Sequence, residues 1–409
     1  FLSIMKIVNF SEQNSIVNQY LAEIRDVDYQ KNRLLFRNNI QRIGELEAYE
    51  ISKTLDYEAR DITTPLGVAR MQVPTDKIVL ATIFRAGLRQ ILPPEVELIS
   101  GPGCPVCVTP DSYIDAALRY GAMPGVILTT FGDMLKVPGS TGSLSEAAAR
   151  GADVRVVYSP LDSLPIAAEN PDKLVIFLAV GFETTAPAIA ASVMAAKERG
   201  LKNFFLLSAP KLVPPAMKLL LDDPATQVDG FLLPGHVAVV TGTEAFMFLP
   251  REYGRPGVVA GFEPLELLRA IYRLVKMTAA GTPRIENAYG RVVRPEGNPA
   301  ARAVMDAVYE PTDADWRGLG RIPRSGLRLR DSWRSFDIMA VRPVHTTPAP
   351  KVTACRCGEV LKGQATPRDC RLFGVACVPE HAAGPCMVSV EGVCAAWYKY
   401  GRGAFQYGG

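Results

Sequence analysis

The sequence predicts an α/β protein with two parallel-sheet, Rossmann-like α/β domains followed by a small cysteine-rich domain. First, short apolar runs alternate with helix-like segments from about residue 78 onward, which is the pattern of βαβ units and parallel sheets. Second, the chain has 409 residues, more than one core usually supports. Third, six of its eight cysteines lie between Cys355 and Cys394.

Residues 11–55 predict two amphipathic helices, because apolar positions recur at helical spacing between charged ones. The strands expected after them are 77–84, 96–100, 125–131, 153–159, 173–182, 203–209, 230–235 and 257–262. Residues 311–350 are rich in Arg and Pro and poorly periodic, which predicts a linker. The predicted domains are 1–82, 83–165, 166–340 and 341–409.

Polar, glycine-rich stretches follow several of the expected strands. They are "SGPGCPVC", "FGDMLKVPGS", "GFETTAP", "PGHVAVVTG" and "GFEP". Ligands of open α/β sheets bind beyond the carboxyl ends of the strands, so these stretches favour a shared cleft over simple turn chemistry.

The composition limits the classes of partner that we expect. With 45 basic and 42 acidic residues the net charge is +3, which argues against a general nucleic-acid binder. The densest basic stretch, from Arg317 to Arg334, is interpreted as a solvated connecting segment rather than a phosphate-binding track. The apolar run 173–182 is about half as long as a membrane span. The first residues do not resemble a signal peptide, so we expect a cytoplasmic protein that binds no membrane.

Cysteines in a cytoplasmic protein favour metal binding or redox chemistry over structural disulfides. Cys104 and Cys107 form a C-x-x-C motif directly after an expected strand. A helix beginning there would lower the thiol pKa and favour disulfide exchange. Half of a zinc site is the other interpretation, although no second C-x-x-C is present.

The terminal cysteines have the spacing C-x-C-x12-C-x6-C-x8-C-x7-C. Zinc ribbons carry paired C-x2-C knuckles and bacterial ferredoxins carry C-x2-C-x2-C, and this spacing matches neither. Four thiolates could bind an iron–sulfur cluster and leave two for one dithiol. The spacing alone leaves cluster and zinc equally open.

Six stretches occur in the order found in one family. They are "SGPGCPVCVTP", "TTFGDMLKVPGS", "AVGFETTAP", "LLPGHVAVVTG", "VAGFEPLELL" and the tail with "CRCG", "GPCMVS" and "EGVCAAWYKYG". From about Ile83 to Lys399 the chain thus resembles the HypD family of [NiFe]-hydrogenase maturation proteins. The resemblance implies two α/β domains and a [4Fe–4S] domain. It also implies a scaffold on which iron receives cyanide and carbon monoxide with a HypC chaperone and a HypE cyanide donor, rather than a simple turnover enzyme.

The resemblance also implies roles for individual residues. The [4Fe–4S] ligands would be Cys355, Cys370, Cys377 and Cys394. The redox dithiols would be Cys357 with Cys386 and Cys104 with Cys107, which together carry electrons toward a transient iron with cyanide and carbon monoxide ligands. Asp133 and His236 would line the assembly cleft, whereas composition alone would make a single histidine such as His236 a structural residue. His345 and His381 receive no functional prediction.

The resemblance fails before Ile83. HypD proteins carry a C-G-G-H-T-H motif there, whose cysteine is thought to bind the iron, and this chain has "DKIVLATIFRAGLRQ" with no cysteine before Cys104. Residues 5–88 instead resemble the amino-terminal part of a uracil phosphoribosyltransferase, in which Arg85 would contact pyrophosphate. The rest of that enzyme's pocket is missing from the sequence. We therefore predict a fusion or chimera joined near residues 81–88. A phosphoribosyltransferase-like fragment and a structural zinc-binding interaction protein are the competing functions.

Overall fold

The computed structural model describes residues 14–26, 39, 42–43, 46, 57–64, 67–74, 96–346, 354–389 and 391–400. The chain divides into two compact units, residues 1–81 and 82–409. In the first unit, helix α1 (Ile16–Arg25) confirms one of the two predicted helices. Its start is fixed by a capping box, in which Ser15 Oγ accepts the N–H of Val17 and Asn18 Oδ1 accepts the N–H of Ser15. The second predicted helix lies largely outside the described residues.

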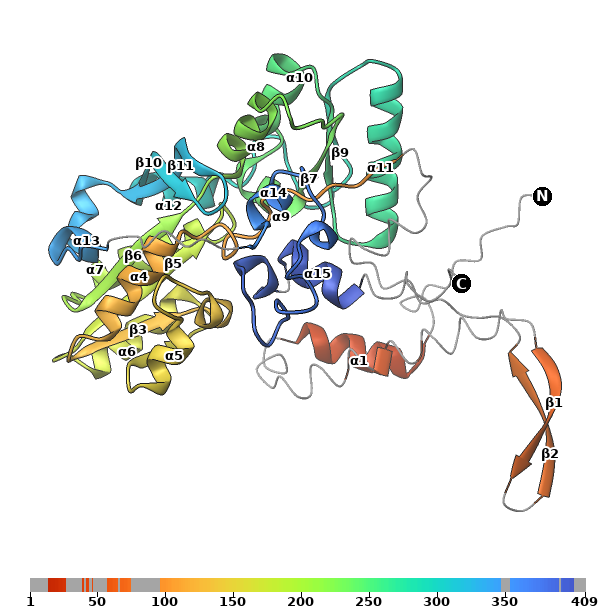
Figure 1. Ribbon diagram of the computed structural model, residues 1–409, viewed down its shortest axis with the longest axis horizontal. Helices are drawn as coiled ribbons and strands as arrows, with labels where there is room; N and C mark the ends of the chain where they lie inside the picture. Colours follow the sequence, from red (N-terminus) through yellow and green to blue (C-terminus); the bar gives the residue numbers. More distant parts are fainter. Residues whose placement is uncertain are drawn as a thin grey trace. The chain divides into compact units, whose positions relative to one another are not determined.

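The first unit also contains an antiparallel hairpin that the sequence did not suggest. Strands β1 (Tyr57–Thr64) and β2 (Gly67–Pro74) pair from Tyr57 opposite Pro74 to Thr64 opposite Gly67 (Figure 1). The expected strand 77–84 lies outside the described residues.

The second unit contains a four-stranded parallel sheet in the order β4-β3-β5-β6, which confirms the predicted α/β class. Its strands are β3 (Val126–Thr130), β4 (Asp153–Val156), β5 (Leu174–Gly181) and β6 (Phe204–Pro210). The expected boundary between residues 165 and 166 falls between β4 and β5, and both belong to this sheet. Residues 96–100, expected to form a strand, are described and form none.

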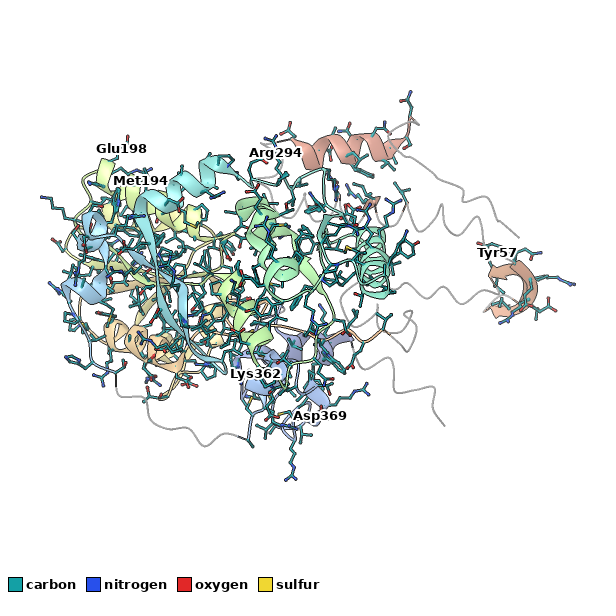
Figure 2. All side chains as sticks on the ribbon, turned by 90° about the horizontal axis from the view of Figure 1, so that it is seen from above. Tyr57, Met194, Glu198, Arg294, Lys362 and Asp369 are labelled. Atoms are coloured by element: carbon teal, nitrogen blue, oxygen red, sulfur yellow. The ribbon has the colours of Figure 1, made fainter. Side chains whose placement is uncertain are left out.

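Side chains of this sheet alternate between two cores, as the period of a strand requires. On β5, Ile176 and Leu178 face the core formed with α4 and the cysteine-rich region, whereas Val175 and Phe177 face the core that includes α6 and α7. Figure 2 shows side chains crowded among the strands and helices of this part of the chain. The helices that accompany the sheet are α4 (Asp111–Gly121), α5 (Leu144–Ala149), α6 (Ser163–Glu169), α7 (Ala186–Glu198), α8 (Val213–Asp222) and α12 (Pro299–Val308).

A second parallel sheet has the order β7-β8-β9 and its own apolar cores. Its elements are β7 (Phe231–Pro234), α9 (Gly235–Thr241), α10 (Phe248–Glu252), β8 (Gly257–Ala260), α11 (Pro264–Ala279) and β9 (Ile285–Asn287). The chain then returns to the first sheet through α12, which contacts α7. The second sheet therefore lies in the chain between the first sheet and the later elements, α12 and the hairpin 309–329, that pack against the first sheet.

The prediction of a linker over residues 311–350 is wrong for its described part. Strands β10 (Tyr309–Trp316) and β11 (Gly320–Leu329) form an antiparallel hairpin, followed by the helical turn Asp331–Phe336 and α13 (Ile338–Val341). Trp316 is buried, its indole N–H donates to Ser325 Oγ at 2.8 Å, and its ring stacks on Phe182. The arginines of β11 stand three and four residues apart, at 321, 324 and 328, and the hairpin register shifts between Thr312 and Ala314. The stretch therefore lacks the period-two pattern that would have predicted a strand.

The cysteine-rich region contains α14 (Cys357–Leu361) and α15 (Val393–Tyr400), with short helical turns at Pro367–Asp369 and Pro385–Met387. Cys377, Cys386 and Cys394 belong to the same core as α4 and one face of the first sheet. The region is therefore packed onto that sheet rather than tethered to it. Within the described part of the chain, no helix has the length and apolar character needed to cross a bilayer.

Candidate thiol and metal site

The C-x-x-C motif lies in a turn. Residues 105–108 are turn residues, and α4 begins only at Asp111, after Pro110 in an extended conformation. No helix starts at the motif, so the condition under which a helix would lower the thiol pKa is not met. The pKa of Cys107 is raised well above its usual value, first by its hydrogen bond with Cys104 and also by burial. The two sulfurs are 2.7 Å apart.

Five cysteines of the tail line one cavity between the start of α14 and the start of α15. They are Cys355, Cys357, Cys370, Cys377 and Cys394. The cavity is small, with a volume of about 10 Å³. Cys355 Sγ and Cys357 Sγ are 3.0 Å apart. Gly384 contributes to this closeness, since a Cβ there would lie 2.6 Å from both of these sulfurs.

A chain of sulfur contacts joins this cavity to the C-x-x-C turn. Cys107 and Cys357 both shift the pKa of Cys386, and Cys357 raises that of Cys394, so these thiols lie near one another. Cys107 Sγ also lies 3.5 Å from the carbonyl oxygen of Pro385. The structure thus brings all of the predicted thiols into one connected region, although the chain separates Cys107 from Pro385 by 278 residues.

Burial and neighbouring sulfurs raise the pKa of several thiols in this region. The pKa of Cys386 is raised by its hydrogen bond with Cys107, and that of Cys394 by its hydrogen bond with Cys357. The pKa of Cys377 is raised by burial, although the N–H groups of Gly384 and Ala383 donate to its sulfur and oppose the rise. Negative charge would therefore concentrate here only with a compensating cation.

A metal group fits this site by the chemistry of its donors. Five converging thiols match the soft ligands that iron–sulfur clusters and zinc require. Backbone N–H donors to Cys377 resemble the hydrogen bonds that tune cluster potentials. Among the residues that the structure describes, no set of three or more His, Cys, Asp or Glu side chains forms a ready-made ion site. The donor set fits, and the sulfurs must separate to admit the group.

The two predicted cleft residues lie in different surroundings. Asp133 follows β3 and accepts a hydrogen bond from Ser389 Oγ at 2.7 Å, which links it to the cysteine-rich region. His236 is the second residue of α9, in the second sheet's part of the chain, and is exposed, with its ring 4.1 Å from that of Phe262. No contact between His236 and a cysteine is found in the described residues.

Sequence reasoning missed two buried charged residues and one largely buried one near the carboxyl ends of the first sheet. Glu183, after β5, and Lys211, after β6, are both buried. Arg317 occupies the turn between β10 and β11 with its side chain only 14% exposed. The glutamate in "GFETTAP" and the lysine directly after β6 follow apolar strands, a position that could have identified them.

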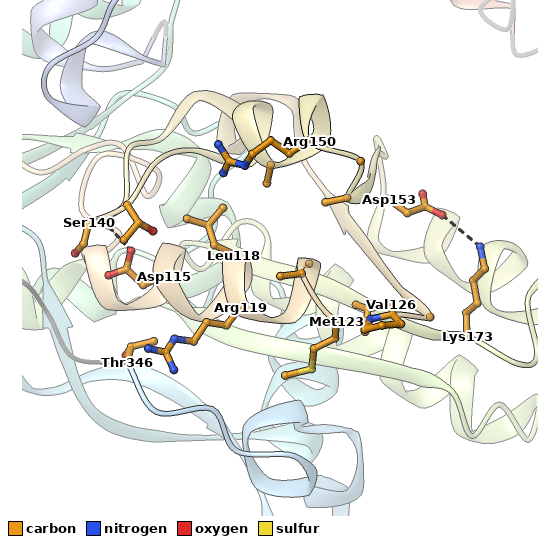
Figure 3. A pocket seen from close by; sticks show the side chains of 18 residues that line it. Asp115, Leu118, Arg119, Met123, Val126, Ser140, Arg150, Asp153, Lys173 and Thr346 are labelled. Carbon is orange, nitrogen blue, oxygen red and sulfur yellow. Dashed lines mark hydrogen bonds and ion pairs between the residues drawn. The ribbon is translucent and has the colours of Figure 1, made fainter.

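A larger pocket of about 700 Å³ lies beside α4 and the amino ends of β3 and β4 (Figure 3). Asp115 accepts the N–H of Ser140 at 2.7 Å on one side, and Lys173 pairs with Asp153 at 3.6 Å on the other. None of the predicted site residues lines it.

Comparisons with known proteins point to one family. The family model described as "HypD: Hydrogenase formation hypA family" matches residues 78–401. Hydrogenase maturation factor HypD of Escherichia coli K12 is 47% identical over 323 residues, covering 78% of this chain and 86% of that protein. The factors of the same name from Azotobacter vinelandii and Cupriavidus necator are 46% and 44% identical, with the same coverage. The resemblance of residues 5–88 to a uracil phosphoribosyltransferase finds no support in these matches and stays a prediction.

Proposed function

The chain belongs to the HypD family of hydrogenase maturation factors, and from this premise we propose that it is a redox-active scaffold for assembling an iron unit with cyanide and carbon monoxide ligands. The observation that carries the proposal is the continuous series of sulfur contacts from Cys104 to the cavity of the tail. Such a series suits a protein that moves electrons to a bound metal. A protein with this role needs no pocket for a substrate that it converts.

We assign the four ligands of a [4Fe–4S] cluster to cysteines of the tail cavity, namely Cys355, Cys370, Cys377 and Cys394. When bound, the cluster would supply or accept single electrons. The N–H groups of Ala383 and Gly384 would stabilise the negative charge on one ligand sulfur. The buried position on the first sheet would limit the access of water.

The remaining four thiols form two pairs in contact. If Cys104 and Cys107 are joined as a disulfide, Cys386 can attack Cys107, which forms a mixed disulfide and releases Cys104 as a thiol. Attack of Cys357 on Cys386 then forms the Cys357–Cys386 disulfide and frees Cys107. Two electrons and two protons pass to the Cys104–Cys107 pair, and one sulfur–sulfur bond is broken as one is formed. The contacts of Cys386 with both Cys107 and Cys357 support this order.

The partners and compartment follow from the family. A HypC-type chaperone and a HypE-type cyanide donor would bind to the scaffold, and the protein would act in the cytoplasm. Asp133 and His236 are proposed to face the assembled iron. Because "DKIVLATIFRAGLRQ" stands where the family's C-G-G-H-T-H motif would be, we propose that this chain assembles the iron unit weakly or not at all.

Serine substitutions test the division between ligands and dithiol. After anaerobic purification, Cys370→Ser should lose most of its iron and acid-labile sulfide, because a ligand thiolate is removed. Cys386→Ser should keep both but lose one oxidisable thiol pair. Loss of iron from Cys386→Ser and its retention in Cys370→Ser would refute the assignment.

A further inference from the structure

The pocket of about 700 Å³ beside α4 lies at the amino ends of the strands of the first sheet (Figure 3). Val126 begins β3, Asp153 begins β4 and Lys173 directly precedes β5, and all three line this pocket. Asp133, whose carboxylate is bound by the cysteine-rich region, follows the carboxyl end of β3 instead. Parallel strands place their amino ends at one edge of a sheet and their carboxyl ends at the other. The pocket is therefore separate from the thiol site, and none of the cysteines lines it.

Two polar atoms at one end of the pocket are buried and unpaired. Asp115 is 7% exposed, and its Oδ1 accepts the backbone N–H of Ser140 at 2.7 Å. Its Oδ2 and the hydroxyl oxygen of Ser140 have no hydrogen-bond partner among the residues that the structure describes. Both residues line the pocket, and Figure 3 shows them side by side. Since buried polar groups are nearly always hydrogen-bonded, this pair suits a bound molecule that offers a donor to Asp115.

The loop that carries Ser140 is held closely against α4. The N–H of Gly139 donates to the carbonyl oxygen of Gly142 at 2.8 Å, which closes the loop. A Cβ on Gly139 would lie 2.6 Å from Asp115 Oδ1 and 2.9 Å from the Cγ2 atom of Ile114, so only glycine permits this approach. Asp115 and Ser140 are thus fixed relative to each other before a ligand binds, which lowers the entropy that binding costs.

Two arginines without partners also line the pocket. They are Arg119 on α4 and Arg150 directly after α5, and neither guanidinium has an ion-pair or hydrogen-bond partner in the described parts of the chain. Arg150 Nη2 would lie 3.9 Å from a Cβ on Gly142, so this cation lies close to the loop just described. The pocket thus offers free positive charge to an anion.

The rest of the lining is apolar or neutralises itself. Asp153 pairs with Lys173 at 3.6 Å, while Leu118, Met123 and Val126 contribute apolar surface. A volume of about 700 Å³ lies within the range of roughly 300–1,000 Å³ that is typical of sites for small molecules. The lining therefore combines an acceptor, a hydroxyl and two free cations with apolar walls.

We propose that this pocket binds a small hydroxylated organic anion, whose carboxylate or phosphate is attracted by Arg119 and Arg150 and whose hydroxyl group donates to Asp115 Oδ2. The hydroxyl of Ser140 adds a second hydrogen bond at the same end. An inorganic anion without a donor would leave the acceptor on Asp115 unpaired and would meet its negative charge, so the hydroxyl is part of the recognition. This inference does not depend on the iron-assembly function, because the pocket shares no residue with the cysteine cavity.

Isothermal titration calorimetry of the full chain, purified anaerobically, tests the proposal with a matched pair of ligands. Malate is succinate with one added hydroxyl, so the ratio of their dissociation constants isolates the hydrogen bond to Asp115. Malate should bind with a Kd of about 1 mM or below and about tenfold more tightly than succinate. Glycerol 3-phosphate tests the phosphate form of the same chemistry. The tighter of malate and glycerol 3-phosphate identifies the anionic group, and either result supports the site.

Substitutions locate the binding. Asp115→Asn keeps an oxygen acceptor for the N–H of Ser140 but removes the charged acceptor, so the preference for malate over succinate should fall to about threefold or less. Arg119→Gln and Arg150→Gln should each weaken malate binding about three- to tenfold, because each removes one nearby positive charge. Arg199→Gln is the matched control, since Arg199 is exposed at the end of α7 and does not line the pocket. Its affinity should stay within about twofold of the unaltered chain, because salt screens distant charges.

Absence of binding by both malate and glycerol 3-phosphate up to about 10 mM would overturn the proposal, as would equal binding of malate and succinate. Unchanged binding in both Arg119→Gln and Arg150→Gln would refute the pocket as the site. If Asp115→Asn does not fold, the comparison of malate with succinate in the unaltered chain decides, and the two arginine variants, whose side chains are exposed, locate the site. Iron content has no part in these outcomes, so a failure of the cluster assignment is distinguishable.

Discussion

Glu183 is a buried carboxyl group whose protonation should make the stability of the protein depend on pH near neutrality. It is 1% exposed, and its Oε1 accepts the backbone N–H of Val213 at 2.8 Å. Its Oε2 is buried without a hydrogen-bond partner in the part of the chain that the structure describes. Burial raises the pKa of Glu183 from 4.5 to about 7, against the effect of the backbone N–H donors.

The direction of the pH dependence follows from the raised pKa of Glu183. The native state binds this proton more tightly than the unfolded state, so the contribution to stability is fully present below about pH 4.5 and is lost as the pH rises through about 7. Each pKa unit corresponds to about 1.4 kcal/mol. The rise from 4.5 to about 7 therefore corresponds to about 3 kcal/mol in the free energy of unfolding.

Glu183→Gln isolates this contribution, because glutamine keeps an oxygen acceptor for Val213 and stays neutral. Urea unfolding from about pH 4 to about pH 8 should show nearly equal stabilities at the acid end and a variant more stable by about 2–3 kcal/mol at the basic end. Lys211, whose pKa burial lowers to about 8, titrates in both proteins and cancels from the difference. Exposed Glu169→Gln is the control. A difference that stays constant over this pH range would refute the reasoning.

Three further predictions concern the contacts of the site. Gly318→Ala should destabilise the protein by about 1–2 kcal/mol more than Gly320→Ala in urea unfolding. Both glycines have φ +79°, but only a Cβ on Gly318 would clash with the cysteine-rich region. Equal losses of stability in the two variants would contradict this contact. Ser389→Ala should lower the free energy of unfolding by about 1–2 kcal/mol and speed hydrogen exchange in the tail, because it removes the hydrogen bond to Asp133. Asp133→Asn is the control, since asparagine keeps an oxygen acceptor for Ser389. Unchanged hydrogen exchange in the tail of Ser389→Ala would argue against this anchor. Placing C-G-G-H-T-H directly before Ile83 should restore hydrogenase maturation in cells that lack their own factor, and a soluble, cluster-loaded but inactive product would contradict that explanation.

Much of the fold could be predicted because local patterns determine it. The apolar run around β5 and the helices flanking it are explained by periodicity, since each is one element with one or two buried faces. The hairpin of β10 and β11 was missed because its solvent face carries arginines and its turn carries Gly318 and Gly320, which together resemble a linker.

The contacts between residues of the site could not be predicted from the spacing of the cysteines in the sequence. Cys107 meets Cys386 only because the tail packs onto the sheet that follows the C-x-x-C motif, and no local pattern encodes a contact at that separation. No helix starts at Cys104, because residues 105–108 form a turn and α4 begins only at Asp111. Arg317 was assigned to a solvated segment because a charge run does not reveal which of its members is buried.

The most direct measurement of the central claim is the content of iron, acid-labile sulfide and zinc per chain after strictly anaerobic purification. The thiol cavity predicts about four irons and four sulfides per chain with little zinc. Stoichiometric zinc without sulfide would show that the tail is a structural zinc site, and would contradict a redox-active scaffold.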